Sequence, residues 1–416
     1  MLDGWASPGS APLHRSSPPP TSPLRISQMT TQFTRFVRRS ASSSAWAIAA
    51  TMAMSGETSV LAKPPVELTV KLDQDRPGTL GLATIAASHH LLYDAEKEVF
   101  QFCHHPNISV LRDRLCVTWS NGLQSEDFNG QRVLWSTTGD GIHWEKPRTL
   151  VPDPDGEDGP LCAVTTGVYD SGDALVAYYS AMKRGNPAHP NHISTVYAVS
   201  SEDGRNWGTP RKIIEGFFIE KPRPLPSGRL LLNGQFPDAS TCLLYSDSRD
   251  GMSGWKAASI APFPDFKGGF PEPNWFIRKD GSIVMFFRAN GVPWLYASIS
   301  NDNGAVYSAP ERTNFPSTGS RMAVGNLPDG RAFCIWNPSV KFGRNPLVLS
   351  LSDDGANFRS AYVLRGEPTR RKLKGTHKAD GWQYASATVW RNALWVVYSV
   401  NKEDVVVSSI NLPDLH

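Results

Sequence analysis

Five short polar segments hold the side chains best suited to chemistry in this chain of 416 residues, and each stands just before an apolar run. Together they offer imidazole, carboxylate, guanidinium and phenol groups. An imidazole can give or take a proton near neutral pH, and a planar guanidinium can bind a carboxylate through two parallel charge-assisted hydrogen bonds. These residue types suit acid–base chemistry on an acidic substrate. The segments are His104-His105-Pro106-Asn107, Glu220-Lys221-Pro222-Arg223, Glu272-Pro273-Asn274-Trp275, Ser320-Arg321 and Gln383-Tyr384.

The elements that would position these segments are marked by a turn motif that occurs five times. Each copy combines Ser or Thr with Asp and Gly and ends in an aromatic residue, and successive aromatics lie 63, 48, 52 and 51 residues apart. This interval is the length of one four-stranded blade of a β-propeller. The copies are TTGDGIHW ending at Trp144, SSEDGRNW at Trp207, SRDGMSGW at Trp255, SNDNGAVY at Tyr307 and LSDDGANF at Phe358.

The motif is expected to stabilise a turn rather than to do chemistry. Its hydroxyl and carboxylate groups can bond backbone N–H groups, its Gly can adopt positive φ, and its aromatic can pack under the hairpin. Aligned on the final aromatic, the copy ending at Tyr307 keeps every polar position, and Asp250 also keeps its place. In the other copies the Asp falls one place later or beside a second acid, namely Asp140, Asp203 beside Glu202, and Asp354 beside Asp353.

These features predict an all-β, six-bladed β-propeller. The chain has 34 Gly and 33 Pro, too many for a helical bundle. Six units lie between about residues 104 and 412, the last of which, at 387–412, has apolar strands without the motif. Residues 66–94 are expected to supply a strand that pairs with the last blade and closes the ring. Seven blades is the alternative, because the 63-residue interval and the N-terminal segment leave room for another.

The composition argues against several partners and cofactors. The 42 basic and 39 acidic residues give a net charge of +3 and are scattered along the chain, so no basic stripe points to nucleic acid. The five cysteines are odd in number and widely spaced, which indicates buried free thiols rather than a disulfide framework or a CxxC metal site. We therefore expect a monomer with no metal, no cofactor and no nucleic-acid partner.

Residues 1–62 have the pattern of an N-terminal extension and signal peptide. A basic stretch around Arg38 precedes an apolar run at 45–54, and Val60-Leu61-Ala62 fits a small-residue cleavage site. The apolar run is short of the roughly 20 residues that span a bilayer. We expect a mature propeller of residues 63–416, secreted or periplasmic, with no membrane span. The start codon is left open between Met1 and Met29.

The turn motif resembles the Asp-box, or BNR repeat, of the sialidase superfamily, Ser-x-Asp-x-Gly-x-x-Trp. The polar segments extend this resemblance. Tyr384, within residues 381–386, resembles the tyrosine nucleophile that precedes the last sialidase blade. Glu272 and Arg288 resemble the acidic partner of that tyrosine and one arginine of the carboxylate-binding triad, and Arg321 resembles another triad arginine.

The resemblance implies a glycoside hydrolase that releases a terminal acidic sugar from a glycan without a cofactor. Tyr384 would attack the sugar, and Glu272 or Glu220 would relay the proton of the phenol. Asp127 would protonate the leaving oxygen. The two triad-like arginines would orient the carboxylate of the substrate.

Two departures from the sialidase pattern lead to a second hypothesis. His104-His105-Pro106 stands where a sialidase has Arg-Ile-Pro, and Tyr398-Ser399 stands where the family has Tyr-Glu. Propeller lyases and rhamnosidases that act on uronate polysaccharides resemble this arrangement loosely. In such an enzyme His105 and Tyr384 would be the acid–base groups, with His104 beside them, and Arg288 or Arg223 would neutralise the uronate.

A third hypothesis is a carbohydrate-binding propeller without catalysis, because Asp-box propellers include binding modules and a fold alone does not decide function. In that case Tyr384 packs at the start of a strand and Asp127 is solvated in its loop. Arg223 and Arg288 then form salt bridges between blades.

Overall fold

The computed structural model describes residues 64–416 apart from gaps at 129, 153–154, 157–158, 184–193 and 263–269. The expected extension and signal peptide at 1–62 lie outside the described residues. The described residues form strands, turns and two short 3-10 helices, η1 (Ala95–Lys97) and η2 (Leu412–Asp414). They contain no α-helix. No helix among these residues is long and apolar enough to cross a membrane.

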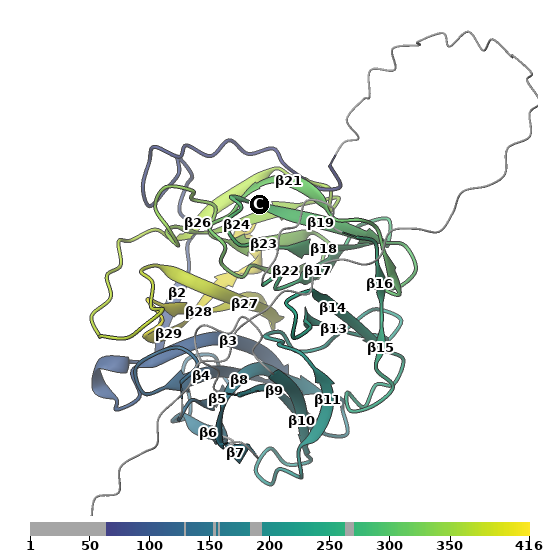
Figure 1. Cartoon of the computed structure of the whole chain (residues 1–416). Coiled ribbons are helices and arrows are strands. Elements are labelled where there is room, and N and C mark those ends of the chain that lie inside the picture. The colour runs from purple at the N-terminus through teal and green to yellow at the C-terminus, as the bar shows by residue number, and fades with distance from the viewer. Residues whose placement is uncertain (1–63, 129, 153–154, 157–158, 184–193, 263–269) are drawn as a thin grey trace, which may run out of the picture. The chain divides into compact units, whose positions relative to one another are not determined.

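Six antiparallel sheets follow one another around a common centre (Figure 1). Blade 1 contains β3 (Phe102–Leu111), β4 (Arg114–Gly122), β5 (Arg132–Thr138) and β6 (Arg148–Val151). Blade 2 contains β8 (Gly159–Asp170), β9 (Leu175–Lys183), β10 (Ser194–Ser201) and β11 (Arg211–Glu215), with β7 (Asp155–Gly156) added beside β8. Blade 3 contains β12 (Arg223–Pro224), β13 (Leu230–Gln235), β14 (Thr241–Ser246) and β15 (Lys256–Ala257).

The second half of the ring repeats this plan. Blade 4 contains β17 (Asn274–Ile277), β18 (Ile283–Phe287), β19 (Trp294–Ser300) and β21 (Glu311–Pro316). Blade 5 contains β22 (Ala323–Asn326), β23 (Ala332–Trp336), β24 (Leu347–Ser352) and β26 (Ser360–Arg365). Blade 6 contains β27 (Trp382–Trp390), β28 (Ala393–Val400), β29 (Asp404–Asn411) and β2 (Ser88–Tyr93). The first strands of neighbouring blades, such as β27 with β3 and β3 with β8, contact one another, so they line the centre.

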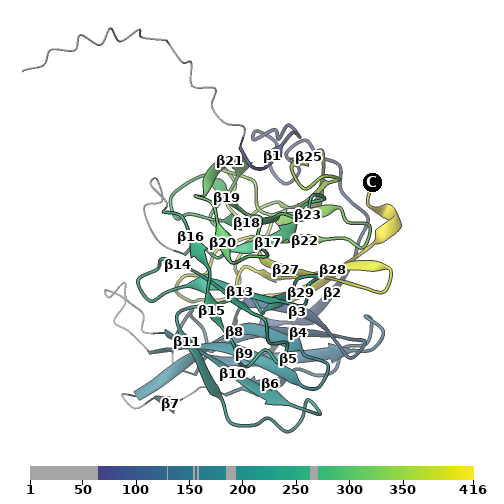
Figure 2. The same cartoon turned by 90° about the vertical axis from the view of Figure 1, so that its right-hand side faces the viewer.

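The ring is closed by the N-terminal strand, as the sequence predicts. β2 pairs antiparallel with β29, with Ser88 opposite Ser409 and Tyr93 opposite Val405, and the two strands lie side by side in Figure 2. The alternative of seven blades is wrong, because the described strands form six blades. The long interval before Trp207 is taken up by the 12-residue β8 and the nine-residue β9 within blade 2.

The five Asp-boxes make the expected turn in the same way despite their different alignments. In the copy at 138–144, Asp140 Oδ1 accepts the backbone N–H groups of Ile142 and His143, both at 2.8 Å. Asp203, Asp250 and Asp354 likewise accept the N–H groups two and three residues on, and Asp302 accepts those three and four residues on. Counted from the Ser or Thr rather than from the aromatic, the Asp stands two places later in all five copies. The shift noted from the sequence therefore leaves the turn intact.

Aromatic side chains fill the space between blades. Between blades 4 and 5, five rings pack with centroids 5.2–5.8 Å apart, and one of them, Phe358, ends an Asp-box. Phe358 belongs to β25 (Asn357–Phe358), which pairs in parallel with β1 (Glu67–Leu68). Cys103, Cys116, Cys162, Cys242 and Cys334 are all buried and free, which confirms the prediction of unpaired thiols.

Candidate active site

Two innermost strands carry the central side chains, and both strands are bulged there. β3 holds His104 and His105, and β27 holds Tyr384. The register of β3 against β4 shifts directly after His104, and that of β27 against β28 shifts directly after Gln383. A bulge interrupts the alternation of side chains along a strand and re-aims the residues within it. The imidazoles and the phenol are thereby brought together at the centre of the ring.

Four of the five residues expected to be catalytic have a left-handed backbone. The φ angles are +51° at His105, +57° at Asp127, +39° at Glu272 and +59° at Tyr384. Residues other than glycine rarely adopt this conformation, which costs of order 1–3 kcal/mol each and persists where the surrounding structure enforces it. Such strain gathers at functional sites, so this group of outliers favours a functional role for the cluster.

Tyr384, Glu272 and Arg288 form a closed triangle of two hydrogen bonds and one ion pair. The Tyr384 hydroxyl donates to Glu272 Oε1 at 2.9 Å, and Arg288 Nη1 donates to the Tyr384 oxygen at 3.0 Å. Arg288 Nε lies 3.0 Å from Glu272 Oε2 and also donates to the carbonyl of Phe270, while Nη1 donates to the carbonyl of Gly319. All three side chains are buried. The guanidinium thus fixes both the phenol and the carboxylate.

Burial controls the protonation of this triangle. It raises the pKa of Tyr384 above its ordinary value, and the Arg288 guanidinium opposes this rise. Burial also raises the pKa of Glu272, again against Arg288 and the hydrogen bond from Tyr384. The phenol therefore rests neutral and hydrogen-bonded to Glu272, whose Oε1 is placed to accept the phenol proton when the oxygen attacks.

The two histidines pack directly on Tyr384. The ring centroid of His104 lies 3.9 Å from that of Tyr384, and the centroid of His105 lies 5.3 Å away. His104 is fully buried, and neither of its ring nitrogens has a hydrogen-bond partner. Burial, followed by the charge of Lys402, lowers the pKa of both histidines well below the ordinary value. Both imidazoles are neutral at physiological pH and could serve as bases.

Asp127 lies in a pocket beside this cluster. The pocket has a volume of about 80 Å³ and is also lined by Phe217, Gln235 and Phe270. Phe217 contacts His105, with ring centroids 6.0 Å apart. Burial, followed by the charge of the neighbouring Glu126, raises the pKa of Asp127 to about 7. Asp127 can therefore carry a proton near neutral pH, as a general acid must.

Arg321 and Glu220 lie next to the triangle, since Arg321 is 5.9 Å from the ring centroid of Tyr384 and Glu220 lines a small pocket with Glu272, but their contacts serve the packing of blades. The Arg321 guanidinium is fully buried and donates to the carbonyls of Pro106 at 2.6 Å and Ile219 at 2.7 Å, and to those of Tyr384 and Ala385. Glu220 Oε1 lies 3.6 Å from Arg321 Nε. These contacts leave Arg321 no free donor pair for a substrate carboxylate.

Arg223 likewise joins blades. Its guanidinium donates to the carbonyl of Val324 at 2.9 Å and to Asn274 Oδ1 at 2.7 Å, and it lies 4.2 Å from the ring centroid of Trp275. The structure thus brings Tyr384, Glu272, Arg288, His104 and His105 together, with Asp127 alongside, and it engages Arg223, Arg321 and Glu220 in contacts between blades.

The architecture matches a known family. The family described as a BNR repeat-like domain matches residues 113–397, which is more than half of the chain. The chain belongs to this family. No curated protein matches it.

Solved structures with the same fold as this BNR repeat-like propeller include sialidases. A protein titled "Sialidase" has a TM-score of 0.63 at 21% identity, over 84% of this chain and 35% of that protein. "Hadza microbial sialidase Hz136" has a TM-score of 0.64 at 14% identity, over 78% of this chain and 68% of that protein. A protein of unknown function from Dyadobacter fermentans has a TM-score of 0.60 at 16% identity, over 78% of this chain and 97% of that protein. The propeller thus spans about a third of the first of these chains, and the likeness is one of fold.

Three charged residues of the site, Glu126, Lys402 and Arg344, were not predicted from the sequence. Glu126 Oε2 lies 2.5 Å from Lys402 Nζ of the β28–β29 turn, and its Oε1 lies 3.5 Å from His104 Nε2. The Arg344 guanidinium lies 5.1 Å from the ring centroid of Tyr384 and donates to the side chain of Gln383. Glu126 could have been noticed beside Asp127, whereas no local pattern marks Arg344 or Lys402.

His104, His105 and Glu126 form the one group in the described part of the chain whose ligand atoms could surround a metal ion, all within 4.8 Å of one another. The Lys402 ammonium already neutralises Glu126, and Arg288 and Arg344 lie 5.7 and 5.1 Å from the ring centroid of Tyr384. A second positive ion would be repelled by these groups. The propeller therefore offers a cationic site around neutral imidazoles, which suits an anion better than a metal.

Proposed function

We propose that this BNR repeat-like propeller is a glycoside hydrolase that releases a terminal acidic sugar from glycans, with Tyr384 as the nucleophile. The observation that carries the proposal is the buried Tyr384–Glu272–Arg288 triangle at the centre of the ring. A neutral phenol avoids the repulsion that a carboxylate nucleophile would meet from an anionic substrate. The titles of the sialidases that share the fold support the same class of reaction.

The mechanism has two steps. In the first, the Tyr384 oxygen bonds to the anomeric carbon and its proton passes to Glu272, while Asp127 gives its proton to the leaving glycosidic oxygen. In the second, water attacks the same carbon, Asp127 takes a proton from that water, and the bond to Tyr384 breaks as Glu272 returns the phenol proton. The configuration of the sugar is retained.

The preference for an acidic sugar rests on a surplus of cations. Arg288, Arg344 and Lys402 come from three blades or their connections and surround Tyr384 and Glu126. Glu272 and Glu126 neutralise two of these three cations. Arg344 is the cation without a carboxylate partner among the described residues, so we assign it, with Arg288, to the carboxylate of the substrate.

The test is a panel of aryl glycosides and uronate polysaccharides assayed with the wild type, Tyr384→Phe and a control, Tyr398→Phe. Loss of the nucleophile should lower kcat by about 10³-fold or more. Tyr398 is also a buried phenol of blade 6, bound to Arg365 and Ser408 at 2.7 Å each, so its variant controls for loss of a buried hydroxyl. Equal activity of Tyr384→Phe and wild type would remove the nucleophile assignment.

A uronate lyase or rhamnosidase-type enzyme is the second candidate, favoured by the neutral His105 that packs on Tyr384. In a lyase, His105 would take the proton next to the uronate carboxylate and Tyr384 would protonate the leaving oxygen. A product with a new double bond, which absorbs in the ultraviolet, would favour the lyase, and a saturated reducing sugar would favour the hydrolase.

A carbohydrate-binding propeller without catalysis is the third candidate. It predicts that acidic oligosaccharides bind in calorimetry with no turnover by any method. Binding without turnover across the whole panel would exclude both enzymatic proposals and support a binding propeller.

A further inference from the structure

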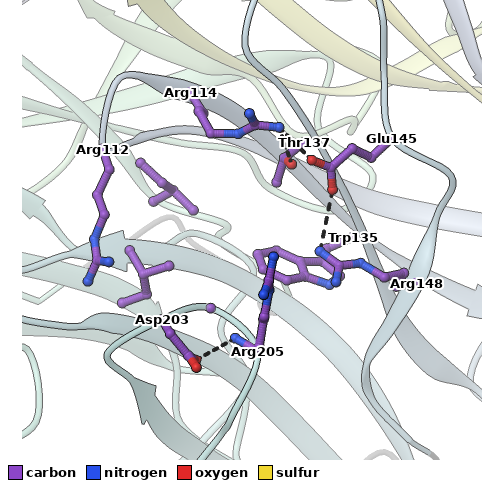
Figure 3. Close-up of a pocket in the computed structure, with 11 residues that line it drawn as sticks. Arg112, Arg114, Trp135, Thr137, Glu145, Arg148, Asp203 and Arg205 are labelled. Atoms are coloured by element: carbon purple, nitrogen blue, oxygen red, sulfur yellow. Dashed lines mark hydrogen bonds and ion pairs between the residues drawn. The ribbon is translucent and has the colours of Figure 1, made fainter.

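A second polar pocket lies between blades 1 and 2, at the opposite end of the blades from Tyr384. Its volume is about 330 Å³, within the range of small-ligand pockets. β3 begins beside the candidate active site with His104 and ends at this pocket with Leu111. The walls come from the β3–β4 turn, β5 and β6 of blade 1 and the Asp-box of blade 2 (Figure 3).

Four arginines line this pocket, from four separate positions in the fold: Arg112, Arg114, Arg148 and Arg205. Glu145 serves two of them, since its Oε1 lies 2.6 Å from Arg114 Nη2 and its Oε2 lies 3.5 Å from Arg148 Nη2. Asp203 stabilises the turn of its own Asp-box, where it accepts the backbone N–H groups of Arg205 and Asn206.

The guanidinium groups of Arg112 and Arg205 have no ion pair or side-chain hydrogen bond with any residue in the described ranges. Only their backbone N–H groups are engaged, that of Arg112 by Asp170 Oδ2 at 2.9 Å and that of Arg205 by Asp203 Oδ1 at 2.7 Å. In Figure 3 the Arg112 side chain lies on the side of the pocket away from Glu145. The lining thus carries a surplus of positive charge and two guanidinium groups with free donors.

Aromatic and polar contacts join the residues of the pocket floor. The Trp135 ring packs edge-to-face on Trp207, with centroids 5.9 Å apart, and Arg148 lies 5.1 Å from the centroid of Trp135. Arg114 is held by a hydrogen bond of 3.1 Å to Thr137 Oγ1. Arg114 and Arg148 are therefore already paired within the lining, although each side chain stays about half exposed, at 46% and 51%.

The next gap around the ring, between blades 2 and 3, is built from the same positions but carries different side chains. Its pocket has a volume of about 410 Å³. When positions are counted along the sequence from the aromatic that ends each Asp-box, Arg148 corresponds to Arg211 and Trp135 corresponds to Ala198. When they are counted from the Asp of each box, Arg205 corresponds to Met252.

The charges of this neighbouring pocket balance. Arg211 and Arg249 are the cations of its lining, and Asp173 and Asp250 are its anions. The propeller geometry thus makes a hollow at both places, whereas the cluster of four arginines belongs to the first hollow alone.

We infer that the pocket between blades 1 and 2 binds the oxyanion groups of an acidic oligosaccharide, sulfate esters or uronate carboxylates. Guanidinium groups on opposite walls can take adjacent anionic substituents through paired hydrogen bonds. Arg112 and Arg205 supply the free donors, and Arg114 and Arg148, which share Glu145, leave one further positive charge. This assignment is independent of turnover at Tyr384 and goes beyond the proposed function.

Calorimetry on the full chain tests the inference with a heparin-derived tetrasaccharide, the same tetrasaccharide without sulfate, inorganic sulfate and an oligoglutamate peptide. The double variant Arg112→Ala/Arg205→Ala should weaken binding of the sulfated tetrasaccharide about tenfold or more, because each arginine loses a charge-assisted contact. The matched control Arg211→Ala/Arg249→Ala removes the same charge from the balanced pocket and should change binding less than twofold. Both variants should hydrolyse a small aryl glycoside like the wild type.

Three results would overturn the inference. Equal weakening by the two double variants would show that binding depends on net charge alone. Equal binding of the peptide or of inorganic sulfate would remove the saccharide assignment. Absence of binding by the wild type would remove the site, and none of these results bears on the Tyr384→Phe test of the proposed function.

Discussion

At the scale of single residues, the site separates the protonation states of its groups by burial and charge. Tyr384 and the two histidines are kept neutral, and burial raises the pKa of Glu272 against the opposing charge of Arg288. Asp127 differs because burial raises its pKa, Glu126 adds to that rise and Lys402 opposes it. Burial and the Glu126–Lys402 pair together set the pKa of Asp127 near neutral pH, above that of an ordinary carboxyl group.

This pair predicts a pH dependence. If Asp127 must carry a proton, kcat/KM falls as pH rises through about 7, the pKa of Asp127. Glu126→Gln removes the like charge and leaves Lys402 unpaired, and both effects lower the pKa of Asp127. The high-pH limb of the profile should then move to lower pH. The measurement is kcat/KM on an aryl glycoside from pH 4 to 9.

The control for this shift is Glu215→Gln, because Glu215 is an exposed carboxylate paired with Lys212 at 2.8 Å. Its profile should match that of the wild type. A Glu126→Gln limb at the wild-type position would mean that Asp127 is not the group whose protonation limits the rate.

At the scale of elements, the Asp-boxes and the bulges do separate work. Each box satisfies backbone N–H groups within one turn, so it stabilises a blade without reaching the site. The bulges in β3 and β27 break the pairing that the blades otherwise keep, and they do so at His104 and Gln383, next to the groups proposed for catalysis. Stability and chemistry are therefore assigned to different strands, because each box follows the third strand of its blade and the bulges interrupt first strands.

The fifth box allows this division to be measured. Asp354 accepts the N–H groups of Ala356 at 2.8 Å and Asn357 at 2.7 Å, and the hydroxyl of Ser352 at 2.9 Å. Asp354→Ala should lower the free energy of unfolding by about 1–2 kcal/mol in urea denaturation, with kcat unchanged. Asp353→Ala, at the exposed acid one position earlier, should leave both unchanged. Equal losses from the two substitutions would contradict this assignment of the turn.

Local signals explain why sequence predicted the blades and only part of the site. An Asp-box is complete within eight residues, so its five copies give the blade spacing directly. Tyr384, Glu272 and Arg288 could be chosen by residue type and resemblance. Lys402 reaches Glu126 across 276 positions of the chain, and no local pattern records such a contact.

Arg321 shows the converse limit of sequence reasoning. Its residue type suits a substrate carboxylate, but backbone carbonyls from distant segments surround it in the folded chain. Residue type alone cannot distinguish a guanidinium that binds a ligand from one that joins blades, because the difference lies in contacts made only after folding.

At the scale of the whole molecule, ring closure depends on a strand from the other end of the chain. β2 provides the outer strand of blade 6, and without it β29 would present an unpaired edge. We propose that the extension at 1–62 is removed on secretion or export to the periplasm, which would leave a mature chain that still contains β1 and β2. The processed chain can therefore close the ring only if the N-terminal extension is cleaved before residue 88, where β2 begins.

Three chains that begin at Lys63, Ala86 and Ala95 test this dependence. The chain from Lys63 should fold with the stability of the processed protein. The chain from Ala86 lacks β1 and the buried Val66 and Leu68, so it should melt at a lower temperature but stay monomeric. The chain from Ala95 also lacks β2, and its open β29 edge should cause aggregation or a further large loss of stability. Size-exclusion chromatography and thermal melting measure both effects, and identical behaviour of the chains from Ala86 and Ala95 would show that the six blades hold together without the closing strand.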